Sequence, residues 1–548
     1  MFALVLPPQT GSIFFIAILL AFSLFHSCGS VKQNSSATAP PQRIPTSHYL
    51  DCSAAANGTG TQSSPWNTLA NANTAFIPGD HLLLKRGTTC NGTLAPQGSG
   101  FATAPIVIDA YGSGPAAIIN GGAAEEVLKL FNQQYWEINN LEIVGGRKYG
   151  VYISGDTPNS SLNHIYLKNL DAHGATFNST KRADSGEVFL STSGTGEVFN
   201  DVLIDGVVAH DTHASEGIFV SAGGGWTYDA TARQTLGNKI TVQNSIAHDV
   251  YGDGIVINEL TNGLLQSNIV YRSGQCPDCT GSTPVGLWEW FCHTCTVQFN
   301  ESYANSSWEG DGGDFDIDYY NNDNIVQYNY GHDSAGYCVA FFGSAGTAHR
   351  NIFRYNVCAN NARRASLSGQ GEIFVYTWND GSLDGVQIYN NTISWNPAGE
   401  GYVLSAAGAS YTGSSPLFFR NNIIYAAAPG LVQASASLIL DNNLYYTTTG
   451  TQNFEINANT YTSLAAYQSA TGEDAHSQQA DPLLTTPTYH DVGKPTTAFH
   501  LFAGSPAIAT GANVCANISG CAKGAQDFWG NALPSSGPYN IGAYQGPR

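Results

Sequence analysis

The chain has 548 residues, of which only 11% are charged, and its formal net charge is −20. A single hydrophobic core rarely grows to this length, so we expect either several domains or one elongated array of repeats. The negative charge argues against nucleic acid as a partner, because phosphate binding needs clustered lysine and arginine, and 42% hydrophobic residues exclude a disordered chain.

The N-terminus contains an apolar run from Ile13 to Phe25. This run is too short for a membrane span and has the length of a signal-peptide core. Cys28 follows it directly, so the segment resembles a bacterial lipoprotein signal in which Cys28 would carry a lipid anchor; plain secretion is the alternative. We therefore predict a signal peptide over 1–28, a flexible linker over 29–47, and a bacterial protein that is secreted or held on the outer surface.

The segment 48–122 is predicted to form an N-terminal cap and the first coils of a repeat array, since the ends of such arrays need covering. It contains a candidate amphipathic helix at Pro65–Asn73. Two apolar segments follow, Pro78–Gly87 and Ala104–Gly112, and both have the character of strands.

The segment 123–447 repeats one unit, in which an apolar-alternating strand is followed by Asn or Asp and a second short strand. Clear copies are Val202–Asp211, Ile240–Asp249 and Ile325–Asp333. This pattern predicts an all-β fold, a right-handed parallel β-helix. Asparagine suits its turns, because it tolerates the left-handed backbone conformation and can stack its amide on the next coil. The recurring asparagines are Asn244, Asn268, Asn300, Asn329, Asn356, Asn390 and Asn421.

Three aspartates, Asp314, Asp316 and Asp318, alternate with Phe315 and Ile317. On a strand the apolar pair would face the core and the carboxylates would face outward, with Cα atoms about 6.6–6.8 Å apart. Inverting glycosidases separate their two carboxyl groups by roughly 6.5–9.5 Å. The aspartates are therefore candidate catalytic residues; the alternatives are a calcium site formed by Asp314 and Asp316, or a solvated strand face.

Neighbouring coils lie about 4.8 Å apart and could bring further groups to the same surface. Asp253 and Glu289 are candidate catalytic partners of the aspartates, although Asp253 precedes a glycine and could equally be a turn residue. Trp288 and Trp290 would form a platform for sugar stacking if they face outward and would be core residues if they face inward. Tyr319, directly after the aspartates, is a further candidate for substrate binding.

Two other kinds of residue are considered for the site. Arg363 could bind the carboxylate of a uronate, or it could lie on a solvated loop. His-Asp pairs recur at His210, His248 and His332, each followed by Asp, and this repetition indicates a structural ladder at a turn. His332 comes one coil after the aspartates, so it is also a candidate proton donor or substrate-binding residue.

Ten cysteines remain besides Cys28, an even number that predicts disulfides in an exported protein. We expect Cys52 to pair with Cys90 and Cys515 to pair with Cys521. Cys338 and Cys358 would pair across coils or remain buried thiols. Disulfides are favoured, and a structural zinc site is the alternative, for the CxxC…CxxC pattern of Cys276, Cys279, Cys292 and Cys295.

The N-terminal segments named above resemble the entry segments of bacterial right-handed β-helix proteins of the pectate-lyase-like superfamily. The C-terminal region 448–548 resembles the same group at Asp481–Leu484, Phe499–Ile508, Asp527–Gly530 and Ile541–Tyr544. The resemblance covers nearly the whole chain after residue 47 and implies a β-helix with a C-terminal capping region. It does not fix the reaction, because this superfamily includes lyases, hydrolases, epimerases and adhesins.

The sequence therefore predicts a carbohydrate-active enzyme that cleaves a polysaccharide. Glycoside hydrolysis is favoured, because the acidic residues cluster while basic residues are few. A calcium-assisted polysaccharide lyase and a non-catalytic glycan-binding or adhesion protein are the alternatives. We expect a monomer, no nucleic-acid partner and no cofactor other than calcium.

Overall fold

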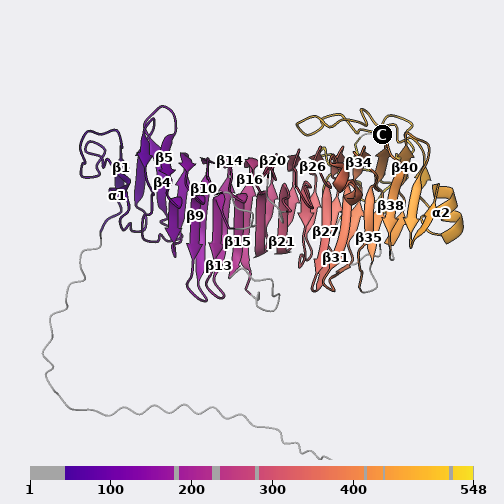
Figure 1. Ribbon diagram of the computed structural model, residues 1–548, viewed down its shortest axis with the longest axis horizontal. Coiled ribbons are helices and arrows are strands. Elements are labelled where there is room, and N and C mark those ends of the chain that lie inside the picture. Colours follow the sequence, from indigo (N-terminus) through magenta and orange to yellow (C-terminus); the bar gives the residue numbers. More distant parts are fainter. Residues whose placement is uncertain are drawn as a thin grey trace, which may run out of the picture. The chain divides into compact units, whose positions relative to one another are not determined.

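A computed structural model describes residues 43–177, 184–224, 235–277, 283–412, 416–435, 438–516 and 523–546. Residues 45–548 belong to one compact unit (Figure 1). The predicted signal peptide and Cys28 lie outside the described residues. Among the described residues, no helix is both long enough and apolar enough to cross a membrane.

The compact unit is a parallel β-helix whose coils each supply short strands to three ladders, which we call faces 1, 2 and 3. Face 1 consists of β1 (Ser47–Leu50), β2 (His81–Lys85), β4 (Ile106–Tyr111), β7 (Trp136–Asn139), β10 (Ser161–Lys168), β13 (Val198–Asp205), β16 (Gly237–Gln243), β19 (Leu264–Gln266), β22 (Thr296–Gln298), β25 (Ile325–Gln327), β29 (Ile352–Arg354), β33 (Gln387–Tyr389), β36 (Leu417–Arg420) and β39 (Leu438–Asp441). Face 2 consists of β6 (Glu126–Phe131), β9 (Tyr149–Gly155), β12 (Gly186–Thr192), β15 (Glu216–Gly224), β18 (Asp253–Thr261), β21 (Leu287–His293), β24 (Phe315–Ile317), β27 (Val339–Ser344), β31 (Ile373–Trp378), β35 (Leu404–Gly408), β38 (Gly430–Ala434) and β41 (Asn453–Ile456). Face 3 consists of β3 (Thr89–Asn91), β5 (Ala117–Gly122), β8 (Leu141–Gly145), β11 (Asp171–His173), β14 (Val208–Thr212), β17 (Ile246–Val250), β20 (Ile269–Tyr271), β23 (Glu301–Tyr303), β26 (Tyr330–His332), β30 (Val357–Ala359), β34 (Thr392–Trp395), β37 (Ile423–Ala426), β40 (Leu444–Thr447) and β43 (Gln478–Gln479).

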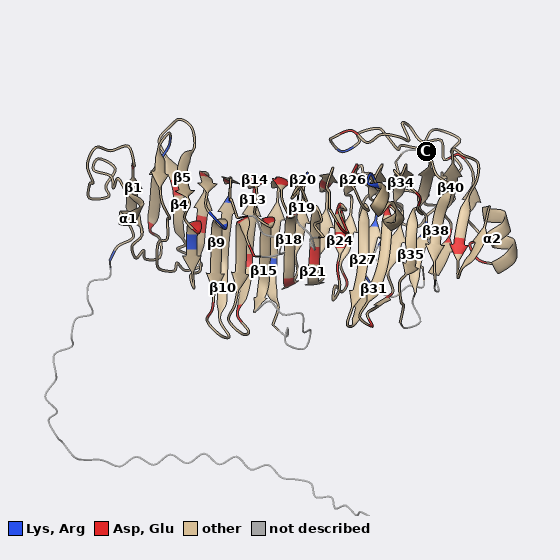
Figure 2. Ribbon diagram, viewed as in Figure 1, with Lys and Arg blue, Asp and Glu red and all other residues tan. Residues whose placement is uncertain are grey.

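The other elements are few. They are α1 (Leu69–Ala72), β28 (Thr347–His349), β32 (Ser382–Asp384), β42 (Asn459–Tyr461), α2 (Leu464–Thr471) and a 3-10 helix at Ala365–Gln370. The predicted right-handed parallel β-helix is thereby confirmed. Figure 2 shows that charged residues are sparse along the strands, as the composition requires.

The core is a stack of inward apolar side chains from successive coils. On face 2 the register aligns Val188 with Ile218, Ile218 with Ile255, Ile255 with Leu287, and Leu287 with Phe315. All five side chains are buried in one continuous cluster. Removing this aliphatic surface from water is the main favourable contribution to folding.

A buried asparagine ladder runs along the turn between faces 1 and 3. Its members are Asn268, Asn300, Asn329, Asn356, Asn391, Asn422 and Asn443. The amide oxygen of Asn329, for example, accepts the backbone N–H of Asn300 at 2.9 Å, and its Nδ2 donates to the Val297 carbonyl at 2.9 Å. Each asparagine thus satisfies backbone groups of its neighbouring coils, which a buried turn requires.

The ladder corrects the sequence prediction in two ways. Asn244, Asn390 and Asn421 are not members; each precedes the residue that occupies the ladder position. The left-handed conformation belongs to that preceding residue, including Phe299 and Tyr328 with φ of 58° and 59°. The asparagine is therefore needed for its amide and not for a left-handed backbone.

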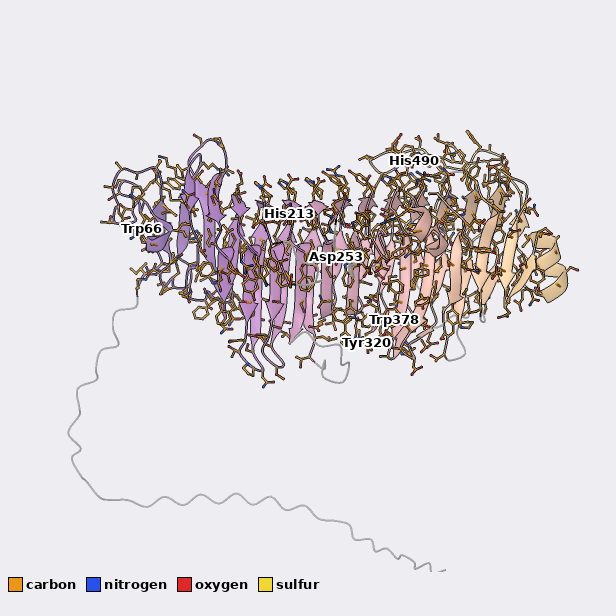
Figure 3. The ribbon with its side chains drawn as sticks, in the orientation of Figure 1. Trp66, His213, Asp253, Tyr320, Trp378 and His490 are labelled. Atoms are coloured by element: carbon orange, nitrogen blue, oxygen red, sulfur yellow. A yellow bond between two sulfur atoms is a disulfide. The ribbon has the colours of Figure 1, made fainter. Side chains whose placement is uncertain are left out.

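The C-terminal segment after β43 packs along face 3 instead of only covering the end of the helix (Figure 1). Phe499, Phe528 and Ile541 join Tyr330 and Leu444 in one apolar cluster. His490, labelled in Figure 3, pairs with Asp333 at 3.1 Å. This part of face 3 is therefore closed to a large ligand.

The disulfide predictions hold in part. Cys52–Cys90 and Cys338–Cys358 are disulfides. Cys276 and Cys515 are also disulfide-bonded, and the expected partner Cys521 lies outside the described residues, as does Cys279. Cys292 and Cys295 are free thiols, so the expectation of disulfides for the four-cysteine pattern is wrong for these two residues.

Candidate active site

The site lies on the outer side of face 2 and is centred on β24. Phe315 and Ile317 point into the core, so Asp316 between them points outward, as the alternation predicts. In the register Asp316 lies between Trp288 of β21 and Ala340 of β27. Alanine on the neighbouring strand leaves space beside the carboxylate.

A pocket of about 600 Å³ opens at this position. Three carboxylates line it, those of Asp311, Asp316 and Asp318. Its aromatic lining consists of Tyr319, Tyr320, Phe342, Phe374, Tyr376 and Trp378. A concave site with an aromatic lining and a few convergent polar groups has the general character of a small-ligand site.

The aromatic wall comes from β27, β31 and the turn after β24. Phe374 and Tyr376 stack at 5.8 Å between ring centroids, and Tyr376 and Trp378 stack at 6.3 Å. Tyr319 meets Trp378 edge-on at 5.5 Å. Figure 3 shows Tyr320 and Trp378 close together at the rim of face 2. Such side chains present an apolar ring with a polar edge, which suits the face of a sugar ring.

The three carboxylates of the pocket belong to residues in different local structures: a strand, the residue after it and the turn before it. Asp316 is on β24, and Asp318 follows the strand and accepts a hydrogen bond from the backbone N–H of Tyr319 at 2.8 Å. Both side chains are almost fully enclosed, with 4% and 6% exposure. Asp311 precedes the strand, in a turn with φ of 55°. The three oxygen donors could also hold a hard cation such as Ca²⁺.

Asp311 is the acidic residue that sequence reasoning missed. It lies in the glycine-rich turn before β24, outside any strand, so strand alternation could not place it. The amide of Gln370, oriented to satisfy both groups, pairs with the backbone of Asp311. The available signal was the cluster of glycines at 310, 312 and 313 beside an acid, which is typical of a tight turn at a functional edge.

Asp314 does not share the outward face, and that part of the prediction is wrong. Its side chain is fully buried at the corner where the chain turns from face 3 into face 2. Its Oδ1 accepts hydrogen bonds from Ser334 Oγ at 2.6 Å and Asn305 Nδ2 at 3.1 Å. Burial raises the pKa of the Asp314 carboxyl well above its usual range. Asp314 therefore holds the corner and is not among the pocket residues, so a calcium site shared with Asp316 is not supported.

Glu289 and the two tryptophans next to it face opposite sides of β21. Glu289 aligns with Ile257 and Ile317, so it points into the core, and the expected surface shared with the aspartates is corrected. Trp288 and Trp290 face outward but are buried among other aromatic residues, and neither lines the pocket. Asp253 is the first residue of β18 and is also buried; its Oδ1 accepts the backbone N–H of Val285 at 2.7 Å, and it is not among the pocket residues.

His332 lies on β26 of face 3, whereas the pocket lies on face 2. Each coil passes through all three faces, so a residue one coil after the aspartates need not lie on the same face. The Nδ1 of His332 bonds Asp333 at 2.8 Å and its Nε2 bonds Glu301 at 3.3 Å. Arg363 lies in a second cavity of about 670 Å³ together with Arg272, Trp308 and Arg364. Neither residue joins the carboxylates.

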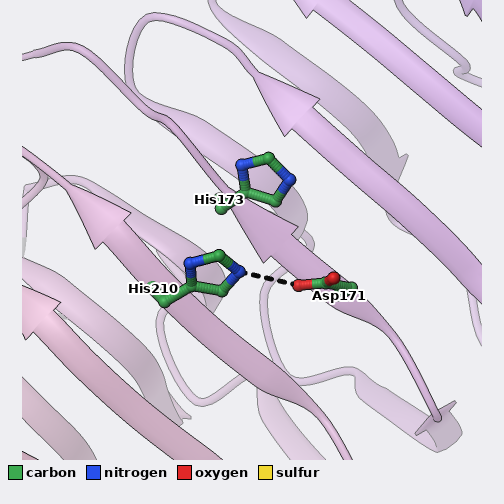
Figure 4. A group of neighbouring side chains, drawn as sticks. All are labelled: Asp171, His173 and His210. Atoms are coloured by element: carbon green, nitrogen blue, oxygen red, sulfur yellow. Dashed lines mark hydrogen bonds and ion pairs between the residues drawn. The ribbon is translucent and has the colours of Figure 1, made fainter.

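The His-Asp pairs form the structural ladder that repetition predicted. His173, His210 and His248 stack along face 3 at 4.7 and 4.9 Å between ring centroids. Figure 4 shows His210 beside His173 and Asp171 of the preceding coil; the Nε2 of His210 lies 2.9 Å from Asp171 Oδ1. The stack continues through Tyr271 and Tyr303 to His332.

Replacement of His332 by Gln should remove a pH-dependent part of the stability. Hydrogen bonds to Asp333 and Glu301 outweigh the effect of burial and raise the pKa of His332 to about 9. A raised folded-state pKa stabilises the protein fully below the unfolded value of about 6.5, and the contribution is lost as pH rises through 9. We expect the difference in unfolding free energy between wild type and His332→Gln to fall by roughly 2–3 kcal/mol from pH 6 to pH 10. Denaturant unfolding at several pH values measures it; the exposed His476→Gln variant is the control, and a pH-independent difference would contradict the assignment.

Comparison with known proteins agrees with this architecture. No protein-family model matches the chain. A lacto-N-biosidase of Bifidobacterium longum subsp. longum is 23% identical over 480 residues, covering 69% of this chain but only 29% of that protein, so the chain spans less than a third of this relative. The crystal structure of a GH136 lacto-N-biosidase from Eubacterium ramulus is similar with a TM-score of 0.52 and 19% identity, over 73% of this chain and 67% of that one. The pectate lyase Pel9A has a TM-score of 0.40 and 15% identity, over 92% of this chain and 97% of that one.

Proposed function

We propose that this protein is an exported glycoside hydrolase that binds a glycan in the face-2 pocket and cleaves it with two of the carboxylates of Asp311, Asp316 and Asp318. The observation that carries the proposal is the convergence of three acids, from a turn, a strand and the residue after the strand, in one aromatic pocket. The likeness to lacto-N-biosidases supports a glycosidase reaction.

The chemistry needs one carboxyl group in each protonation state. A protonated acid donates its proton to the leaving glycosidic oxygen, while an ionised carboxylate activates water or attacks the anomeric carbon. When two acids are close together and poorly hydrated, ionisation of the first opposes ionisation of the second, so one stays protonated while the other is charged. Asp316 and Asp318 meet both conditions, since they are two residues apart in the same pocket and both are nearly enclosed.

The alternatives find less support in the pocket. Elimination by a polysaccharide lyase needs a base and also a cationic group that neutralises the carboxylate of the uronate substrate. No Lys, Arg or His is among the described residues that line this pocket. A non-catalytic glycan-binding protein would need the aromatic wall but not three acids in the pocket.

The disulfides Cys52–Cys90 and Cys338–Cys358 support export, since such bonds persist in oxidising compartments.

The test is a screen of purified protein on plant, algal, microbial and host-type glycans, with lacto-N-biosidase substrates included. The proposal expects new reducing ends without the ultraviolet absorbance of an unsaturated product, and activity that survives EDTA. An unsaturated product, or activity lost in EDTA and restored by Ca²⁺, would instead establish the lyase. Binding without turnover on every glycan that binds would support the adhesion alternative.

Trp378→Ala should weaken substrate binding more than it slows the bond-breaking step. The indole belongs to the pocket wall, where it contacts Tyr319 and Phe342, and it is not part of the inward-facing core stack. Loss of one stacking surface costs roughly 0.5–1.5 kcal/mol, so we expect KM to rise by about 2- to 13-fold with a smaller change in kcat. Phe131→Ala, an exposed ring at the distant β6 end of face 2, is the control. A fall in kcat alone would place Trp378 outside the binding surface.

A further inference from the structure

The inner side of β21, the strand next to the pocket strand β24, carries three potential metal ligands. Glu289 lies on the strand, Cys292 lies near its end, and Cys295 follows in the turn toward face 1. One carboxylate oxygen and the two Sγ atoms lie within 4.8 Å of one another. All three residues are buried.

Glu289 is an anomaly in this core. Its side chain has no exposed surface, and neither carboxylate oxygen has a hydrogen-bond partner of good geometry among the described residues. The Asn324 amide is near enough to lower its pKa slightly, but burial dominates and raises the pKa to about 8. The residues aligned with it on the adjacent strands are Ile257 and Ile317. An apolar residue would fit here without the cost of roughly 1–3 kcal/mol that an unsatisfied buried group carries.

The two thiols also lack strong partners. Cys292 Sγ lies 3.7 Å from the Ile257 carbonyl, and Cys295 Sγ lies 3.8 Å from the His293 carbonyl. Burial raises the pKa of both thiols. The other cysteines among the described residues are disulfide-bonded, so these two are exceptional.

We propose that Glu289, Cys292 and Cys295 bind one Zn²⁺ ion in the core of the β-helix. Two thiolates and a carboxylate are donors that zinc accepts, and thiolates select it over Ca²⁺ or Mg²⁺. Zinc–ligand distances of about 2.0–2.3 Å require donors closer together than 5 Å, as they are here. Binding releases one proton from each ligand, and three anionic ligands around a dication leave a net charge of −1.

The ion accounts for the acid and both thiols together. A disulfide between Cys292 and Cys295 would explain the thiols but would leave the Glu289 carboxyl without a partner. A zinc ion satisfies all three groups, and three protein ligands leave the fourth tetrahedral position for a small molecule such as water. All three ligands come from β21 and the turn after it, so the ion would fix the path of this turn beside the pocket strand, where Glu289 aligns with Ile317.

The site has no exposed ligand, so the ion should enter during folding and leave only on unfolding. We expect elemental analysis of protein purified without chelators to give one zinc per chain. EDTA should leave that zinc in place in the native protein and remove it in denaturant. Refolding with Co²⁺ should then produce a thiolate-to-cobalt charge-transfer band, which histidine or carboxylate ligands do not give.

The variants separate this site from adventitious binding at the surface. Cys292→Ser/Cys295→Ser should abolish the cobalt band and reduce zinc at least tenfold, and Glu289→Gln should weaken binding. Ile317→Val disturbs the same core without removing a ligand and should retain the zinc. His210→Ala removes imidazole from the surface group in Figure 4 and should also leave the cobalt band unchanged.

Two results would overturn the proposal even if the double variant does not fold. One is wild-type protein that refolds in the presence of zinc or cobalt and contains neither ion. The other is peptide mass spectrometry that finds Cys292 joined to Cys295. The test does not depend on the glycosidase proposal, because metal content and the cobalt spectrum are measured without substrate.

Discussion

Two of the three variants Asp311→Asn, Asp316→Asn and Asp318→Asn should each reduce kcat by roughly 10²- to 10⁴-fold, the usual contribution of a general acid or base. Asparagine keeps the size of the side chain but can neither release a proton nor carry the negative charge that the reaction requires. The measurement is kcat and KM on the glycan found in the screen, with a pH–rate profile for each variant. Loss of the acid should remove the high-pH limb of the profile, and loss of the base should remove the low-pH limb.

Asp323→Asn is the matched control for these variants. Asp323 follows the same strand, but it is exposed and forms an ion pair with Arg350. We expect its activity to stay within about twofold of wild type, because surface changes of this kind are usually small. Full activity in all three pocket variants would refute the site, whereas lost turnover with retained glycan binding would support it.

Asn329→Ala should lower the free energy of unfolding by roughly 3–5 kcal/mol, because several buried groups lose their partners at once and each unsatisfied group costs about 1–3 kcal/mol. The amide oxygen of Asn329 accepts hydrogen bonds from the backbone N–H and the side-chain amide of Asn300. Its Nδ2 donates to the Val297 carbonyl and to Asn356 Oδ1. Asn329, Asn300 and Asn356 are all fully buried, so bulk water does not replace the lost hydrogen bonds.

Denaturant unfolding measures this effect by circular dichroism. Asn396→Ala is the control, since that asparagine is exposed and makes one side-chain bond, to Asn360; its effect should stay near 0.5 kcal/mol or below. A loss under about 1 kcal/mol for Asn329→Ala would show that the ladder contributes little to stability.

The repeats made the fold predictable, because turn asparagines and alternating apolar residues recur in coil after coil. The register of the coils was harder to predict from the sequence. Asn390-Asn391 and Asn421-Asn422 each offer two candidates for the ladder, and the sequence does not show which of the pair is buried. Only the alignment with Asn356 on the preceding coil decides between them.

The pocket was predicted to the extent that it lies on β24. Alternation placed Asp316 correctly, but it could not show that the chain turns a corner at Asp314, where side chains stop alternating between core and solvent. The aromatic wall was missed because its members come from coils further along the chain. Phe374 and Ala340 become neighbours of Asp316 only through the register of three successive strands.

The C-terminal segment gives this solenoid long-range contacts that stacked coils alone would lack. Gly493 donates its backbone N–H to Glu301, and Asn390 donates its side-chain amide to the carbonyl of Asn540, contacts that span 192 and 150 residues of chain. Coils can stack as they leave the ribosome, but the apolar strip on face 3 stays uncovered until the last residues arrive. A chain stopped near residue 480 would hold every strand of the helix and still present that strip to other chains, so we expect truncation there to cause aggregation before it causes loss of β structure.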